Sequence, residues 1–351
     1  MRKIQEIKDV IAKVIKWGDT LLNQLEEGNI TVTEAMAVVQ EIPKLVDGIH
    51  SIVREDIFSD YSEFFESFKV LAVKCKDENF LLENVDNLAS SIGLFVECLK
   101  AIDQEYSRRS KVCACCGNLV IYNPLPSYYS EMKIKMGNNQ ESRPETLNAK
   151  EYLCPICGAS DRDRLIVSFL EKLQVNKTEE TLLQVAPAKV IENWIQKNCD
   201  LLTYHSTDLF MDNVTFKSDI QNMNMVEDGK YDYFICSHVL EHVKDDRKAI
   251  KELYRILADD GIGIFLVPID LNVTQTDEEW GLSEEENWKR FGQGDHCRKY
   301  AREDMIERLK EAGFTVHELG ENYFGREVFN QCGLLDTSIL YVLTKGNGPC
   351  V

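Results

Sequence analysis

Residues 231–269 read YDYFICSHVLEHVKDDRKAIKELYRILADDGIGIFLVPI. The apolar runs at 231–239 and 261–269 have the length and composition of buried strands, and between them apolar residues recur at the spacing of a helix. A strand, a helix and a second strand in this order predict part of a parallel sheet that is covered by helices on both faces. We therefore expect an α/β fold around this stretch.

The same alternation continues on both sides of this stretch. Further strand candidates are 181–187, 201–207, 214–218, 315–320 and 338–345, and further helix candidates are 162–174, 189–197 and 302–313. Together with the strands at 231–239 and 261–269, they predict a doubly wound α/β domain. We place this domain at 161–351.

Residues 1–108 show helical periodicity only. Apolar side chains recur at intervals of three and four, as in Ile7, Ile11 and Ile15, and Gly28-Asn29 interrupts the pattern. Because no catalytic combination of residues stands out, we expect an all-α helical bundle that serves homodimerisation or the docking of a partner protein. A contribution to a substrate pocket is the alternative.

Residues 109–160 are irregular, and they contain two knuckle sequences, CACCG at 113–117 and CPICG at 154–158. A tight turn in each knuckle lets two thiolates face one ion, and two such pairs give the tetrahedral four-sulfur set of structural zinc. The expected ligands are Cys113, Cys116, Cys154 and Cys157. Cys115 can replace Cys113 or Cys116, and an iron–sulfur cluster is the alternative to zinc in this zinc-ribbon-like module.

Ligands of open parallel sheets bind at the carboxyl ends of the strands, where the strand order reverses. The residues at three of those ends are Ala186 and Pro187, then Asp208 and Leu209, then Asp219 and Ile220. Small residues at the first end let the backbone approach a ligand closely. Asp208 can bind both hydroxyls of a ribose, and Asp219 can accept from an adenine amino group while Ile220 packs on the ring.

Residues 231–269 resemble the fourth strand, the following helix and the fifth strand of class I S-adenosylmethionine-dependent methyltransferases, with SHVLEHV as a specific part of the signature. The resemblance covers about 181–345 and implies a Rossmann-like seven-stranded domain with S-adenosylmethionine as cofactor. It assigns the ribose to Asp208 and the adenine to Asp219 and Ile220. It also assigns the methionine end of the cofactor to Ser237, His238, Val239 and Leu240.

A narrower group of bacterial methyltransferases carries a zinc knuckle and has an Ala-Pro sequence where the superfamily has a glycine-rich loop. This chain is similar to that group in three segments: CPICGASDRDR at 154–164, LLQVAPA at 182–188 and FGQGDHCRKY at 291–300. The resemblance implies that this chain belongs to a zinc-bearing subgroup of the superfamily.

Polar residues in 291–300 are the candidates for the transfer step, since this segment follows the strand at 261–269. We expect His296 to be the general base, because an imidazole accepts a proton at neutral pH. Arg298 can bind an anionic group of the acceptor, and Tyr300 lies beside both in the sequence. A structured loop whose side chains bond only to one another is the alternative. The acidic segment 274–292 is expected to form a lid, with a solvated face as the alternative.

His238-Val-Leu-Glu241-His242 also fits HxxEH, the inverted zinc-protease motif. That chemistry needs both histidines on one face of a substantial helix. Here the motif directly follows a buried strand and the helix is expected to start near Asp245, which argues against a protease.

The composition limits the class of protein. A net charge of −19 argues against a nucleic-acid substrate, because a phosphate backbone is bound mainly by Lys and Arg. The sequence contains no apolar run of about 18 residues, the length that a membrane-spanning helix needs. The start of the chain lacks the features of a signal peptide, so we expect a cytoplasmic protein. The leading hypothesis is methylation of a small-molecule or glycan-type acceptor on oxygen or nitrogen. A degenerate fold that acts as a zinc-containing scaffold, and an RNA or protein methyltransferase, are the alternatives.

Overall fold

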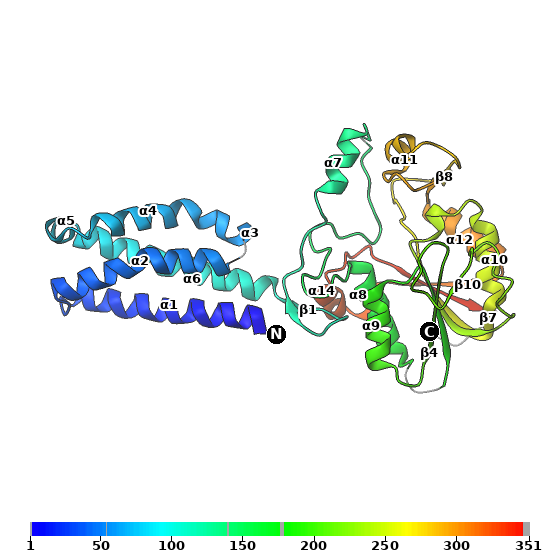
Figure 1. Cartoon of the computed structure of the whole chain (residues 1–351), viewed down its shortest axis with the longest axis horizontal. Helices are drawn as coiled ribbons and strands as arrows, with labels where there is room; N and C mark the ends of the chain where they lie inside the picture. The colour runs from blue at the N-terminus through cyan, green and yellow to red at the C-terminus, as the bar shows by residue number, and fades with distance from the viewer. Residues whose placement is uncertain (1, 54, 139, 176–178, 347–351) are drawn as a thin grey trace. The chain divides into compact units, whose positions relative to one another are not determined.

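The structure is a computed structural model that describes residues 2–53, 55–138, 140–175 and 179–346. It divides into two compact units, Met1–Ser110 and Lys111–Val351, and Figure 1 shows the elements of each. The division into three domains that the sequence suggests stays a prediction.

The first unit is helical throughout its described residues. Its elements are α1 (Arg2–Glu26), α2 (Val32–Ile52), α3 (Glu55–Phe58), the 3₁₀ helix η1 (Ser59–Tyr61), α4 (Ser62–Lys74), α5 (Glu78–Glu83) and α6 (Val85–Arg109). Thr31 caps α2 in a capping box with Glu34. The rings of Phe65 and Phe68 on α4 pack on Phe95 of α6, so aromatic contacts join these helices. A role in homodimerisation or docking stays a prediction.

The second unit is built on a seven-stranded sheet with the order β10-β11-β7-β6-β3-β4-β5 among the described residues. Its strands are β3 (Thr181–Val185), β4 (Thr203–Asp208), β5 (Phe216–Lys217), β6 (Tyr231–Ser237), β7 (Leu257–Leu266), β10 (Phe314–Leu319) and β11 (Leu340–Lys345). Only β11 runs antiparallel to its two neighbours. The strand order reverses between β3 and β6, so a ligand is expected at their carboxyl ends. The predicted Rossmann-like fold is confirmed.

Helices cover both faces of this sheet. The bounds are α8 (Asp161–Leu173), α9 (Lys189–Asn198), α10 (Asp246–Ile256), α12 (Arg302–Glu311), α13 (Glu321–Phe324) and α14 (Arg326–Cys332). Phe234 belongs to the core under α10 and α12, whereas its neighbour Ile235 belongs to the core under α8 and α9. Successive strand residues face opposite sides, which explains why β6 is apolar and buried from Tyr233 to Cys236.

One boundary differs from the prediction. The sequence predicts a helix to 258 and a strand from 261, but α10 ends at Ile256 and β7 begins at Leu257. Leu257 pairs with Tyr231 across a register shift in the β6–β7 ladder. This pairing with a distant residue overrides the local helical pattern.

Three segments outside the sheet contain further small elements: one precedes β3, one follows β6 and one follows β7. These elements are β1 (Lys111–Val112), β2 (Leu119–Val120), α7 (Tyr128–Lys135), the 3₁₀ helix η2 (Leu240–His242), β8 (Asp277–Glu278), α11 (Glu284–Phe291) and β9 (Arg298–Lys299). The prediction of an irregular 109–160 misses α7, which buries no side chain fully and therefore lacks a clear apolar stripe. The rings of Tyr128 and Trp288 meet edge to face, so α7 packs on α11. No helix of the described residues has the length and apolar character that crossing a bilayer requires.

Candidate functional site

The four predicted cysteines lie together in one cluster. Cys113 Sγ is 3.8 Å from Cys157 Sγ, and Cys116 Sγ is 4.0 Å from Cys154 Sγ. A tetrahedral zinc ion with Zn–S bonds of about 2.3 Å needs sulfur separations of about 3.8 Å. The cysteine cluster therefore fits structural zinc.

The two knuckles share one backbone geometry. The amide of Gly117 donates to the carbonyl of Cys113, and the amide of Gly158 donates to the carbonyl of Cys154. Both glycines have positive φ, 68° and 75°, a conformation that costs glycine little. Cys115 stands outside the four-sulfur set and packs against the apolar core instead.

Arg164 joins the second knuckle to the sheet domain. Its fully buried guanidinium lies over the ring of Tyr122 at 3.7 Å from the centroid. It also donates to four main-chain carbonyls, those of Glu151, Tyr152, Ala159 and Cys332. Of the two arginines that follow the CPICG knuckle, Arg162 and Arg164, the second therefore has structural contacts.

The chain turns sharply at Ala186, directly after β3. Ala186 has φ 48°, in the left-handed region, and its amide donates to the carbonyl of Thr207 on the neighbouring strand. Alanine is small, so the backbone stays accessible at this turn, with Pro187 following it.

The acids at the next two strand ends hold their own loops. Asp208 Oδ1 accepts from the amides of Phe210 and Met211 at 2.7 and 2.8 Å. Asp219 Oδ1 accepts from the amide of Gln221 at 2.8 Å. The apolar residues that follow these acids, which the sequence predicts to be part of the same site, differ in exposure: Ile220 is buried and Leu209 is half exposed.

The end of β6 presents a polar atom without a partner. Ser237 Oγ is buried, and among the described residues nothing hydrogen-bonds to it. The following His238 has φ 57°, while Val239 and Leu240 pack against the apolar core. Because buried hydroxyls are normally hydrogen-bonded, Ser237 indicates a place where a ligand supplies the partner.

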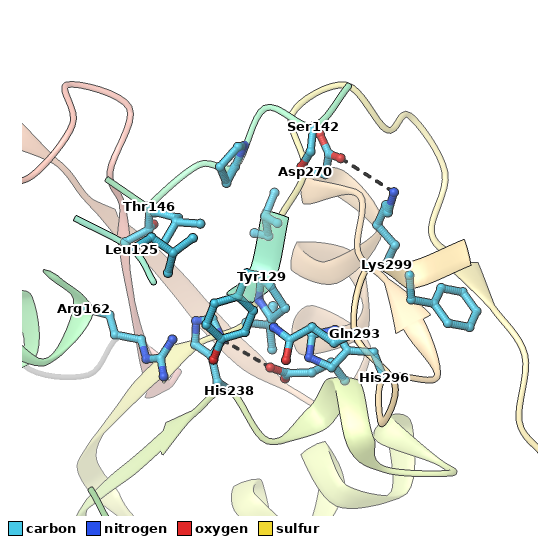
Figure 2. Close-up of a pocket in the computed structure, with 18 of the residues that line it drawn as sticks. Leu125, Tyr129, Ser142, Thr146, Arg162, His238, Asp270, Gln293, His296 and Lys299 are labelled. Atoms are coloured by element: carbon cyan, nitrogen blue, oxygen red, sulfur yellow. Dashed lines mark ion pairs between the residues drawn. The ribbon is translucent and has the colours of Figure 1, made fainter. Parts of the chain in front are cut away.

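A cavity of about 570 Å³ opens beyond the carboxyl ends of β6 and β7 (Figure 2). Its walls come from the start of α8, the residues that follow β6 and β7, the segment 291–299 and the loop between the two knuckles. Of the predicted site residues, the cavity gathers His238, His296 and Arg298, while Tyr300 is absent from its lining.

Three histidines surround Glu241 at this cavity. Glu241 Oε1 lies 3.2 Å from His238 Nδ1 and 3.8 Å from His242 Nε2, and the rings of His242 and His296 meet edge to face. Burial raises the pKa of Glu241, but the histidines outweigh this and hold that pKa at about 2. Burial lowers the pKa of His296 to about 4 and also lowers the pKa of His238. The cluster therefore combines a buried carboxylate with two imidazoles, His238 and His296, whose protonation is disfavoured by burial.

Arg298 and Tyr300 are engaged with the protein itself. The guanidinium of Arg298 donates to Glu278 and to the carbonyls of Leu240, Val243 and Lys244. The hydroxyl of Tyr300 donates to Asp246 Oδ2 at 2.7 Å, and the ring is buried. These contacts fasten the segment 296–300 to the turn after β6. A direct part in the reaction stays a prediction for both residues.

The HxxEH motif ends in η2, a three-residue 3₁₀ helix that begins after His238 and Val239, and α10 begins only at Asp246 with Asp245 as its cap. The long helix that the inverted protease motif requires is thus replaced by a tight turn, as the sequence suggested.

Comparison with known proteins agrees with the fold. Residues 161–319 match the family model described as "Methyltransferase domain". The matched residues lie in the second unit, which has the fold of a methyltransferase domain. Among curated proteins, no sequence match is found. Membership of the zinc-knuckle subgroup stays a prediction.

Solved structures similar to this chain include S-adenosylmethionine-dependent methyltransferases from three organisms. The protein from Archaeoglobus fulgidus is 13% identical, with 53% of this chain and 93% of that chain covered and a TM-score of 0.34. The protein from Mesorhizobium loti is 12% identical, with 50% and 94% covered and a TM-score of 0.34. The protein from Aquifex aeolicus is 13% identical, with 50% and 86% covered and a TM-score of 0.31. Likeness at this level supports no inference about substrate.

Sequence reasoning misses the wall of the cavity that the inter-knuckle loop supplies, including Tyr129, Lys133 and Tyr152. The aromatic residues and prolines of this loop are the only signal, and they point equally to an ordinary structured loop. Arg162 and Glu241 are also missed as lining residues. Glu241 was visible only as part of the HxxEH motif.

Proposed function

We propose that this chain transfers the methyl group of S-adenosylmethionine to a small-molecule or glycan-type acceptor, on oxygen or nitrogen, in the cavity beside β6 and β7. The observation that carries the proposal is the position of this cavity. It opens where a methyltransferase domain brings its strand ends together, directly after the unpartnered Ser237.

S-adenosylmethionine supplies an electrophilic methyl group on a sulfonium when it is bound. The residues present fit it, because Ser237 offers an unsatisfied hydroxyl and the small Ala186 leaves the backbone open at the end of β3. We assign the ribose to Asp208, and the adenine to Asp219 with Ile220. The remaining cofactor residues are Pro187, Leu209, His238, Val239 and Leu240.

The size and charge of the cavity support a small polar acceptor. Pockets of about 300–1,000 Å³ are typical of small-molecule sites, and this one measures about 570 Å³. Three cationic side chains line it besides Arg298, namely Lys133, Arg162 and Lys299, and four carboxylates line it too, those of Asp161, Glu241, Asp270 and Asp295. Lys299 pairs with Asp270, whereas Arg162 lies near His238. Figure 2 shows Arg162 and His238 on the same side of the cavity. An acceptor that carries a carboxylate or phosphate beside its hydroxyl or amine fits this lining.

Zinc has a structural task in this proposal. The two knuckles fix both ends of the loop that forms one wall of the cavity, and all four positions around the ion are taken by cysteine. The metal thus positions acceptor-binding residues and leaves no open position for chemistry.

Transfer to a hydroxyl requires that its proton be removed and that its oxygen be held in line with the methyl group. His296 is the predicted base and lines the cavity next to Glu241 and His242. We assign the handling of this proton to that cluster.

The test is methyl transfer from labelled S-adenosylmethionine to a panel of sugar phosphates, nucleotide sugars, hydroxy acids and amines, incubated with the full chain. We expect label in a low-molecular-weight product. Arg162→Met is expected to raise the acceptor KM more than tenfold, since a lost contact to a charged group costs about 1.5–3 kcal/mol, while Arg326→Met on α14 serves as the matched control. Label that enters only RNA or protein would contradict the proposal.

A further inference from the structure

Glu241, His242 and His296 form a second cluster of metal-ligating side chains, distinct from the cysteines. One donor atom from each residue lies within 4.8 Å of the others. We propose that these three residues bind a divalent transition-metal cation in the cavity.

The distances are close to those of a bound ion. Imidazole nitrogens and carboxylate oxygens lie about 2.0–2.2 Å from zinc and similar ions, so two ligand atoms of a tetrahedral site are about 3.4 Å apart. The donor atoms of the three residues lie within 4.8 Å of one another, and His242 Nε2 is 3.8 Å from Glu241 Oε1. Binding an ion would require the three side chains to move closer together.

Glu241 provides an independent reason for a cation. Its side chain has no exposed surface, and within the described residues neither carboxylate oxygen accepts a hydrogen bond. The nearby His238 Nδ1 makes a charge contact at 3.2 Å without the geometry of a hydrogen bond. A buried carboxylate without donors is costly, and coordination to a metal is one of the few arrangements that offset this cost.

His242 is oriented as a metal ligand. Its Nδ1 lies 3.1 Å from the main-chain carbonyl of Asp295, and a carbonyl can only accept, so Nδ1 carries the proton. Asp295 Oδ2 lies 3.4 Å from the same Nδ1, and Nε2 faces Glu241 Oε1 at 3.8 Å, with a free lone pair in the neutral form of the ring. Metal-binding histidines usually donate their second ring nitrogen to a carbonyl or carboxylate in this way.

The two segments that supply the ligands are held together by other bonds. The amide of Cys297 donates to the carbonyl of Glu241 at 2.8 Å. The guanidinium of Arg298, 3% exposed, donates to the carbonyls that flank the η2 turn. His296 is thereby fixed against Glu241 and His242 before any ion binds, which is the rigid support that metal sites need.

Two imidazoles and one carboxylate suit Zn²⁺, Fe²⁺, Mn²⁺ or Co²⁺. Three protein ligands leave at least one position open, and all three residues line the cavity. Resting on the proposed function, the open position takes the acceptor oxygen. A hydroxyl bound there would have a lowered pKa and release its proton to water, so His296 would act as a metal ligand in place of the predicted base. Its oxygen then bonds to the methyl carbon, and the carbon–sulfur bond breaks with both electrons staying on sulfur.

The experiment counts metal ions on the full chain. After treatment with a chelator and reloading with Co²⁺, we expect two equivalents in the wild type and one in Glu241→Gln and His296→Ala. The remaining equivalent shows thiolate-to-cobalt charge-transfer absorption from the cysteine cluster. Loss of one ligand is expected to weaken the second site at least about 100-fold, since loss of an outer partner alone costs 10–100-fold. One equivalent in the wild type would overturn the inference, with protonated histidines then balancing Glu241.

His317→Gln is the matched histidine control, because His317 lies on β10 and contacts Thr344, and it is expected to keep two equivalents. Circular dichroism of each variant, and the retained thiolate absorption, show that a lost equivalent is not lost folding. Should Glu241→Gln fail to fold, His242→Gln gives the same readout.

Binding of S-adenosylmethionine separates this inference from the proposed function. If the cofactor binds and the second ion does not, the metal site is wrong and the methyltransferase activity stands. If the second ion binds and the cofactor does not, the metal site stands and the proposed function is wrong.

Discussion

Replacing Arg298 with methionine separates the role predicted from the sequence from the one its contacts indicate. As a ligand of an acceptor anion, Arg298 would change the acceptor KM and leave stability alone. In the structure its guanidinium is 3% exposed and bonds to three main-chain carbonyls and Glu278. The substitution is therefore expected to act mainly on stability.

The magnitude follows from the groups left behind. The carbonyls of Leu240 and Val243 lose a donor in a buried setting, at about 1–3 kcal/mol each. Both keep weaker contacts, Leu240 with the amide of Val243 and Val243 with Cys297 Sγ, and the methionine side chain fills most of the volume. We expect a loss of about 3 kcal/mol in the free energy of unfolding of the second unit.

The assay is urea denaturation followed by near-ultraviolet circular dichroism and tryptophan fluorescence. Arg247→Met is the control, because the Arg247–Glu311 pair is half exposed and worth at most about 1 kcal/mol. An Arg298→Met protein with the wild-type midpoint and a raised acceptor KM would refute this reasoning and restore the predicted role.

Three further predictions concern other parts of the domain. Burial raises the pKa of Glu145 to about 7 from 4.5, so the folded state holds an extra proton between these values. Its contribution of about 3 kcal/mol is present below pH 4.5 and lost as the pH rises through 7. Glu145→Gln should flatten this part of the stability–pH curve, and parallel curves for wild type and variant would contradict the assignment. Cys154→Ser should release zinc and raise the acceptor KM, while the affinity for S-adenosylmethionine, measured by calorimetry, changes little. An equal loss of affinity for the acceptor and for the cofactor would contradict the role of the inter-knuckle loop as a wall of the acceptor cavity. Ser237→Ala should weaken S-adenosylmethionine about tenfold through one lost hydrogen bond, and an unchanged affinity would remove Ser237 from the cofactor site.

The sheet could be predicted because its signals are local. Each strand is a short apolar run, and each helix between strands carries one apolar stripe, as α10 shows with Ala249, Ile250 and Leu253 buried. The two CxxC knuckles were equally readable, because four thiolates at this spacing have few other uses. Such patterns can be recognised in the sequence without knowledge of the tertiary contacts.

The direction of side chains in the segment 291–300 could not be predicted. The sequence shows His296, Arg298 and Tyr300 close together in a polar loop, which fits both a catalytic group and a structural clamp. The difference depends on Leu240 and Asp246, more than 40 residues away, which receive the hydrogen bonds of Arg298 and Tyr300. The cavity wall from the inter-knuckle loop depends in the same way on packing, here of α7 on α11.

The central claim is that the second unit is a working methyltransferase domain that binds S-adenosylmethionine at the carboxyl ends of β3, β4 and β6. Isothermal titration of the full chain with S-adenosylmethionine tests it most directly. We predict one binding site per chain with a dissociation constant in the micromolar range, weakened in both Ser237→Ala and Asp208→Ala. No binding at millimolar cofactor would contradict the claim and favour a scaffold built on the same fold.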